Sequence, residues 1–189
     1  MIYPIYVYGS TVLRKKAIEI TKDYPGLEQL IQDMFETMIS SDGVGLAAPQ
    51  IGLPIRIFVV DGTEIKQEED EPAEDLSTFK MAFINPTITK LWGKKWTYNE
   101  GCLSVPTLRE DVERPEKVRI EYYDVNFNFH DEIFERVKSR IIQHEYDHLE
   151  GILFVDRINP LKKRLINGKL NSISKGKVDI SYKIRIPAR

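Results

Sequence analysis

The segment HEYDH at residues 144–148 constrains this chain more than any other feature of its sequence. In a helix, residues four positions apart lie on one face, one turn apart, which is the separation that two ligands of one metal ion need. Glu145 projects beside the two imidazoles and can reach a water molecule bound to such an ion. Ile142 and Leu149 flank the segment, so we expect a buried helix rather than a surface helix with two solvated histidines. The segment therefore predicts a buried site for metal-dependent hydrolysis.

A metal ion that catalyses hydrolysis needs a third protein ligand and one open position. In the metzincin pattern HExxHxxGxxH this ligand is a downstream histidine, but Phe154 occupies that position here and no methionine follows the segment. The thermolysin-like arrangement needs a later glutamate, and none follows Glu150. Only Asp156 and Asp179 remain as downstream carboxylates. We therefore expect the third ligand upstream of the helix.

Cys102 is the strongest upstream candidate for the third ligand. It is the only cysteine of the chain and lies in the segment EGCLS at residues 100–104. The neighbouring glycine lets the backbone approach closely, and a thiolate is a good ligand for zinc or iron. A lone cysteine is more often an inert buried hydrophobe, but the vacant coordination position favours a ligand here. His130, the third histidine, is the competing candidate and lies in a predicted hairpin.

The pattern along the rest of the chain predicts an α+β fold, in which mainly antiparallel sheets pack around the central HExxH helix. Apolar residues at three- and four-residue spacing predict an N-terminal helix that is opened by Asp23 and Pro25 and ends at residues 40–43. The HExxH helix is expected over residues 135–150, and a shorter helix after Asn159. Strands are expected over residues 55–60, 81–84, near 88, 92–98, 117–123, 127–134 and 178–186. The last of these is a C-terminal strand.

We expect a single domain that spans residues 1–189. One segment of this domain differs from the rest in its high content of acidic residues. Residues 62–79 carry seven acidic side chains around Pro72, which predicts a solvated acidic surface insertion. The whole chain has a formal charge of −2, which gives no reason to expect a nucleic-acid partner. No run of about 18 apolar residues predicts a membrane span, and basic residues follow the apolar N-terminus rather than precede it. We therefore expect a cytoplasmic protein with no membrane partner.

Three segments taken together resemble the peptide deformylase family. They are GVGLAAPQ at residues 43–50, EGCLS at residues 100–104 and QHEYDH at residues 143–148, and weaker likeness extends from Tyr8 to about Leu161. The resemblance implies a metal-dependent hydrolase that removes the N-formyl group from the N-terminal formylmethionine of newly made proteins and releases formate. Its implied partners are N-formylmethionyl nascent peptides, which it would bind at the ribosome.

The resemblance also implies the metal and its ligands. Cys102, His144 and His148 would bind one divalent ion, with Fe²⁺ expected and Zn²⁺, Ni²⁺ or Co²⁺ as alternatives. Availability in the cell, rather than affinity alone, decides between such ions.

The resemblance assigns roles in catalysis and substrate binding to further residues. Glu145 would act as general acid and base, while the side-chain amide of Gln50 and the backbone N–H of Leu103 would bind the oxyanion. Val137 and Ile141 are candidates for the substrate pocket from their spacing alone. They precede His144 by seven and three positions and therefore lie on the same helical face. The expected substrate contacts are Gly43, Val44, Gly45, Glu100, Gly101, Arg109, Val137 and Ile141.

Two other functions compete with this interpretation. One is a different HExxH metallohydrolase, such as a peptidase or amidase. The absence of a downstream ligand argues against this function. The other is a metal-stabilised binding module that has lost catalysis. The presence of Glu145 and Gln50 argues against that module, because a binding module needs no general base.

Overall fold

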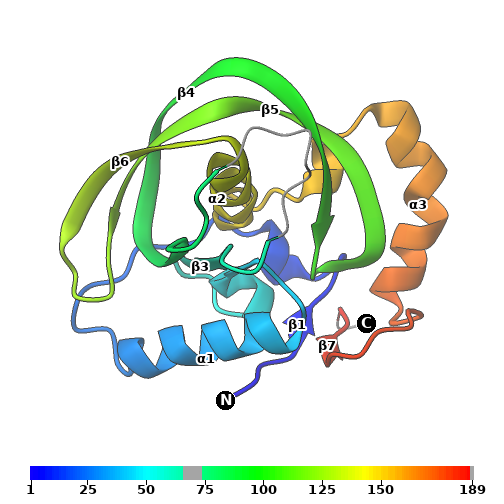
Figure 1. The fold of residues 1–189 in the computed structure, drawn as a ribbon. Helices are drawn as coiled ribbons and strands as arrows, with labels where there is room; N and C mark the ends of the chain where they lie inside the picture. Colours follow the sequence, from blue (N-terminus) through cyan, green and yellow to red (C-terminus); the bar gives the residue numbers. More distant parts are fainter. Residues whose placement is uncertain (66–73, 188–189) are drawn as a thin grey trace.

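The structure is a computed structural model that describes residues 1–65 and 74–187 (Figure 1). Its longer elements are α1 (Leu27–Ser40), β3 (Ile57–Asp61), β4 (Lys80–Cys102), β5 (Val105–Tyr123), β6 (Phe129–Glu135), α2 (Arg136–Leu149) and α3 (Pro160–Ser174). The short elements are β1 (Ile5–Tyr6), η1 (Thr11–Arg14), β2 (Gly45–Ala47), η2 (Ala48–Ile51), η3 (Phe154–Asp156) and β7 (Ile184–Arg185). None of the helices in the described part of the chain is long and apolar enough to cross a membrane.

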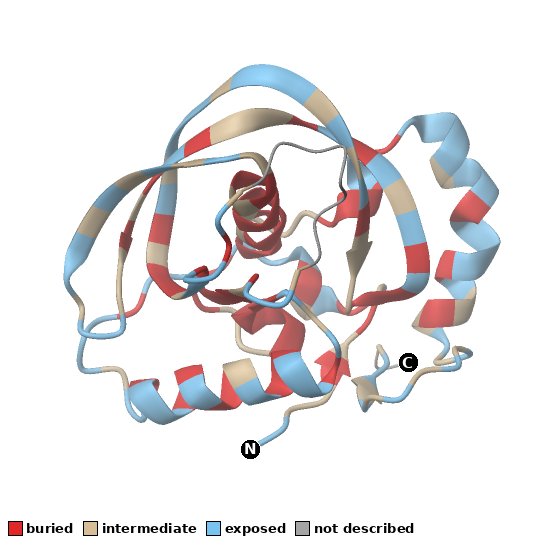
Figure 2. Cartoon of the chain, in the orientation of Figure 1, coloured by how far each residue is buried: buried red, intermediate tan, exposed pale blue. Residues whose placement is uncertain are grey.

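A five-stranded antiparallel sheet wraps around α2. The strand order among the described residues is β2-β3-β4-β5-β6, and every neighbouring pair is antiparallel. The long β4 and β5 strands arch over α2 (Figure 1), and four register shifts in their pairing accommodate this curvature. Eleven of the fourteen residues of α2 are buried (Figure 2). The predicted α+β class, with antiparallel strands around a central buried helix, is confirmed.

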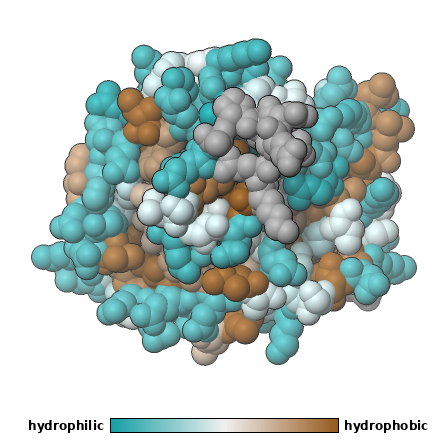
Figure 3. Space-filling model, in the orientation of Figure 1, coloured by the Kyte–Doolittle hydropathy of each residue, from teal (hydrophilic) through white to brown (hydrophobic). Residues whose placement is uncertain are grey.

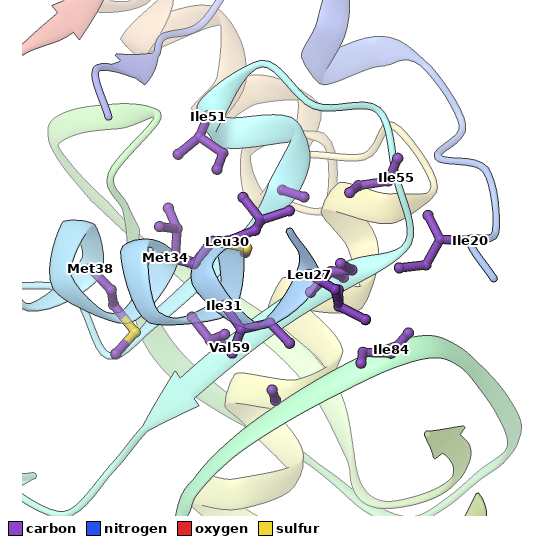
Figure 4. Close-up of a cluster of buried hydrophobic side chains, with 14 of the residues drawn as sticks. Ile20, Leu27, Leu30, Ile31, Met34, Met38, Ile51, Ile55, Val59 and Ile84 are labelled. Carbon is purple, nitrogen blue, oxygen red and sulfur yellow. The ribbon is translucent and has the colours of Figure 1, made fainter. Parts of the chain in front are cut away.

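α1 covers the other side of the strands and forms much of one core cluster (Figure 4). Leu30, Ile31 and Met34 point from α1 into this cluster, as their spacing predicts. The predicted start of the helix is wrong by two residues, because Gly26 rather than Asp23 precedes the first helical residue. Gly26 has φ 68°, a left-handed conformation that glycine adopts without steric cost.

The C-terminal helix α3 is longer than predicted. α3 has 15 residues and is therefore not shorter than α2, which has 14. Its inner face buries Ile166 and Leu170, whereas Leu161 and Leu165 are exposed, and apolar side chains gather over α3 on the surface (Figure 3).

The predicted strand over residues 178–186 is mostly wrong. Only Ile184–Arg185 pair, in parallel with β1, a strand that the sequence did not predict. Val178 and Ile184 pack against a core cluster, and partly buried positions alternate with exposed ones over residues 176–185, so the alternating pattern reflects a segment with one side on the core. Strand pairing is not needed to produce that pattern.

The predicted acidic insertion is not wholly solvated. Its residues 66–73 lie outside the described residues, but Leu76 and Phe79 at its end are buried. The carboxylate of Glu74 accepts hydrogen bonds from the backbone N–H groups of Val137 at 2.9 Å and Lys138 at 3.4 Å. α2 has no side-chain cap of its own, so this segment supplies one to the helix that carries HExxH.

Replacing Glu74 with alanine should lower the free energy of unfolding by about 1 kcal/mol, because two N–H groups in the first turn of α2 lose their acceptor. In a chain of this length that corresponds to a melting temperature lower by roughly 2–4 °C. Glu64→Ala is the control, since Glu64 is an exposed acidic residue of the same segment. Equal melting temperatures for the two variants would show that Glu74 does not stabilise α2.

Candidate metal centre and active site

Cys102, at the end of β4, lies against the two histidines of α2. Its Sγ and one ring nitrogen each of His144 and His148 all lie within 4.8 Å of one another. The distance from Cys102 Sγ to His148 Nε2 is 3.3 Å, and both histidines are buried. Within the described ranges, no other group of three or more His, Cys, Asp or Glu side chains lies as close together.

The competing candidates for the third ligand lie elsewhere. His130, on β6, stacks on Tyr122 at 5.1 Å, and its Nε2 lies 3.0 Å from an oxygen of Asp124. Asp156 accepts hydrogen bonds from Arg14 and from Lys163. The structure therefore brings Cys102, and not these residues, to the two histidines.

Glu100 orients His144. Its Oε2 lies 2.9 Å from His144 Nδ1, so that nitrogen carries a proton and Nε2 is the ring nitrogen left for a metal ion. Arg114 donates to both oxygens of Glu100 at 2.7 and 2.9 Å, and Arg140 donates to Oε1 at 2.9 Å. Glu100 also lines the pocket, as expected of a substrate contact, and both of its carboxylate oxygens have partners within the protein.

The charges around Glu100 keep it ionised. Burial acts to raise the pKa of Glu100, but hydrogen bonds from Arg114 and His144 outweigh it and hold the pKa well below its usual range. Arg114 also donates to Asp147 at 2.7 Å, and Arg157 donates to the same carboxylate. This buried network therefore holds β4, β5 and α2 in one arrangement around the cluster.

Sequence reasoning missed Arg114 and Arg140, although each carried a signal. On β5 the buried positions alternate through Val112, Arg114, Val118 and Ile120, so Arg114 falls on the inward face. Arg140 lies one turn before His144, on the face of α2 that carries the ligands. An arginine at a predicted buried position implies a buried carboxylate partner.

Glu145 lies in the same site with an oxygen that has no protein partner. Its Oε2 is buried and lacks a hydrogen bond among the described residues. Burial raises the pKa of Glu145 to about 7, although the nearby charge of His144 opposes the shift. Gly45 packs against this side chain, because a Cβ at that position would lie 2.8 Å from Glu145 Cγ. A larger residue at position 45 would therefore displace the carboxylate.

Gln50 presents its amide nitrogen to the cluster. The backbone N–H of Ala47 donates to Gln50 Oε1 at 2.8 Å, which fixes the orientation of the amide. Gln50 Nε2 consequently lies 3.2 Å from Ser104 Oγ and 3.6 Å from Cys102 Sγ. Leu103 occupies the turn between β4 and β5, directly after Cys102.

Most of these groups, though not His148, line one pocket with a volume of about 500 Å³. Arg109 also lies at its wall, where two of its nitrogens donate to Asn99. The expected residues that line the pocket are Gly43, Val44, Gly45, Gln50, Glu100, Gly101, Cys102, Leu103, Arg109, Val137, Ile141, His144 and Glu145. Tyr98, Arg140 and Tyr182 line it as well, although no sequence pattern predicted them.

The side chains of the cluster suit a divalent transition metal ion. One thiolate and two imidazoles form a donor set that zinc and iron accept, and three protein ligands leave a position open. Burial lowers the pKa of His148 well below its usual value, so its ring is neutral at pH 7, as a ligand must be. Burial also acts to lower the pKa of His144, but hydrogen bonds with Cys102 and Glu100 outweigh it and raise the pKa. Metal binding at His144 therefore releases a proton.

The α+β fold and the Cys-His-His cluster define a metallohydrolase of the HExxH class. Comparison with known proteins specifies the family, since a model of the family described as polypeptide deformylase matches residues 2–164. The peptide deformylase of Christiangramia forsetii is 51% identical over 99% of this chain and 97% of that protein. The chain belongs to the polypeptide deformylase family, which confirms the resemblance seen in the three motifs.

Solved structures agree with this assignment. A peptide deformylase from Plasmodium falciparum has a TM-score of 0.80 and 37% identity, over 91% of this chain and 95% of that chain. A peptide deformylase from Legionella pneumophila has a TM-score of 0.79 and 35% identity, over 94% of this chain and 98% of that chain.

Proposed function

We propose that this chain removes the N-formyl group from the N-terminal formylmethionine of nascent peptides at a metal ion bound by Cys102, His144 and His148. The convergence of these three side chains within 4.8 Å carries the proposal. The reaction is that of the family to which the chain belongs. Its products are formate and a free N-terminal amine.

Glu145 moves the proton in this reaction. A divalent ion in the cluster supplies Lewis acidity, which lowers the pKa of a water molecule and polarises a carbonyl group. Glu145 accepts the proton that the attacking water gives up and passes it to the leaving amine. A pKa of about 7 suits both steps, because the group accepts and returns a proton readily at neutral pH.

Gln50 and Leu103 stabilise the charge that develops on the formyl oxygen. The Gln50 amide is held by Ala47, so Nε2 does not reorient during the reaction. The Leu103 N–H is the second donor, from the turn that follows Cys102. Removal of one such donor typically costs about 3–4 kcal/mol of transition-state stabilisation.

The peptide chain binds along β2. This strand is at the edge of the sheet and contains Gly45, so an extended substrate can add to it as a further strand. Val44, Val137 and Ile141 supply apolar walls for the methionine side chain. Gly43, Glu100, Gly101 and Arg109 complete the substrate site, and the Glu100 carboxylate also holds His144 in place.

We also propose Fe²⁺ as the native ion and the ribosome, in the cytoplasm, as the place of action. An iron form should lose activity in air much faster than a nickel form of the same protein, because Fe²⁺ and the Cys102 thiolate are both oxidisable. The measurement is the rate of inactivation after anaerobic loading with each metal. Equal rates would contradict iron oxidation as the cause, and metal analysis of anaerobically purified protein tests the native ion itself.

The test of the function is a product analysis with formyl-Met-Ala-Ser. We expect formate and intact Met-Ala-Ser in equal amounts, detected by an enzymatic formate assay and by mass spectrometry. Shorter peptides without formate would instead identify an endopeptidase, the competing function. Absence of any product from the metal-loaded protein would support the binding module.

A further inference from the structure

The C-terminal segment returns to the pocket through Tyr182. Its phenol oxygen donates a hydrogen bond to the backbone carbonyl of Leu103 at 2.8 Å, and Tyr182 is one of the residues that line the pocket. Burial raises the pKa of Tyr182, with the Cys102 sulfur adding to the shift, so the phenol stays protonated and can donate. This segment lies beyond residues 2–164, which match the family model.

The N-terminal segment fixes the position of Tyr182. The backbone N–H of Ile5 donates to Lys183 at 2.9 Å, and that of Val7 donates to Arg185 at 3.1 Å. These bonds form the parallel pairing of β1 with β7, and the two strands lie side by side (Figure 1). Tyr182 directly precedes the first of these bonded residues, which limits its freedom to move.

The turn that presents Leu103 has little support from its own hairpin. Cys102 pairs with Val105, but the next pair is Gly101 with Arg109, so residues 106–108 have no partner on β4. Two-residue hairpin turns usually adopt positive φ angles that match the strand twist, and neither Leu103 nor Ser104 does so.

Bonds from outside the hairpin hold the turn instead. Tyr182 binds the carbonyl of Leu103, and the backbone N–H of Tyr8 donates to the carbonyl of Ser104 at 2.8 Å. The Leu103 side chain packs closely on Gly43, where a Cβ would lie 2.8 Å from Leu103 Cδ1. The turn is therefore held by the two chain ends and by the segment before β2.

We propose, on the basis of the proposed function, that Tyr182 is a positioning residue that aims the Leu103 N–H at the developing oxyanion. The carbonyl and the N–H of Leu103 are joined through one Cα, so anchoring the carbonyl restricts the orientation of the N–H. This donor acts on charge that exists only in the transition state, so its misalignment lowers kcat and leaves KM nearly unchanged. The chain thus uses its C-terminal segment to complete the oxyanion site.

Tyr182→Phe tests this proposal, because it removes only the hydroxyl. We expect kcat to fall about tenfold, which is less than the loss of a whole oxyanion donor, while KM changes less than twofold. Amide hydrogen exchange at Leu103 and Ser104 should also become faster, an effect that does not depend on activity. Tyr122→Phe is the matched control, since it removes a phenol hydrogen bond to Glu132 of 3.0 Å on the β5–β6 pair, outside the pocket lining.

Each alternative outcome has a definite meaning. Unchanged kcat and unchanged exchange in Tyr182→Phe, with an active wild-type enzyme, would overturn the positioning role and leave the proposed function intact. A rise in KM alone would overturn it in favour of a substrate contact, and an equal loss in the control would overturn it in favour of general destabilisation. A wild-type enzyme that releases no formate would overturn the proposed function and this role with it.

Discussion

Replacing Glu145 with glutamine should lower kcat at least a hundredfold while the protein keeps its metal. The glutamine amide has nearly the same shape as the carboxylate but cannot accept the proton of the attacking water, and general acid–base catalysis typically contributes about 10²–10⁴-fold. The site accommodates the substitution, because Gly45 packs closely on the side chain at position 145 and glutamine has nearly the same size as glutamate. The measurements are kcat for formate release and metal content per chain.

Glu135→Gln is the control for this prediction. Glu135 directly precedes α2 and its carboxylate forms a half-exposed ion pair with Lys117, so neutralising it should change kcat less than twofold. Loss of metal from Glu145→Gln would mean that Glu145 is itself a ligand. Unchanged kcat would mean that another group transfers the proton.

Cys102→Ser should abolish formate release and weaken metal binding. A serine hydroxyl is a harder and far less acidic ligand than a thiol, and it stays protonated at pH 7 where the thiolate binds. The substitution changes the side-chain volume little, so the metal-free variant should unfold at nearly the same temperature as the metal-free wild type.

Metal content and turnover together decide the role of Cys102. If the variant retains both, Cys102 is not the third ligand. If it loses metal and unfolds at a much lower temperature even without metal, the sulfur has a packing role in the core cluster that it touches. Loss of both metal and turnover at an unchanged melting temperature is the result that we expect.

The sequence predicted what depends on local periodicity and on the spacing of chemical groups. The four-residue spacing of His144 and His148 needs only a helix, and the apolar stripe of α1 needs only one buried face. Cys102 was predicted as the third ligand because the chain lacks the downstream ligands of other HExxH enzymes. The structure brings its sulfur to the histidines. The boundaries were less accurate, because the N-terminus of α1 depends on the left-handed conformation of Gly26.

Contacts between distant segments could not be predicted in the same way. Glu74 caps α2 from 63 positions away, although its segment has the composition of a solvated loop. Glu100 and Arg140 are 40 positions apart, and only the antiparallel arch of β4 and β5 over α2 brings them together. Tyr182 reaches Leu103 across 79 positions through the β1–β7 pairing. Such contacts follow from the topology, which local patterns do not specify.

The ratio of kcat/KM for formyl-Met-Ala-Ser to that for acetyl-Met-Ala-Ser tests the central claim most directly. The two peptides differ by one methyl group on the reacting carbon. The groups around that carbon are close together, since Gln50 Nε2 lies 3.6 Å from Cys102 Sγ and Gly45 packs on Glu145. A methyl group there displaces the carbonyl, and a misplacement of about 1 Å can cost roughly 100-fold in rate. We therefore predict a ratio of at least about 100 in favour of the formyl peptide, whereas comparable values for the two peptides would contradict a site built to remove formyl groups.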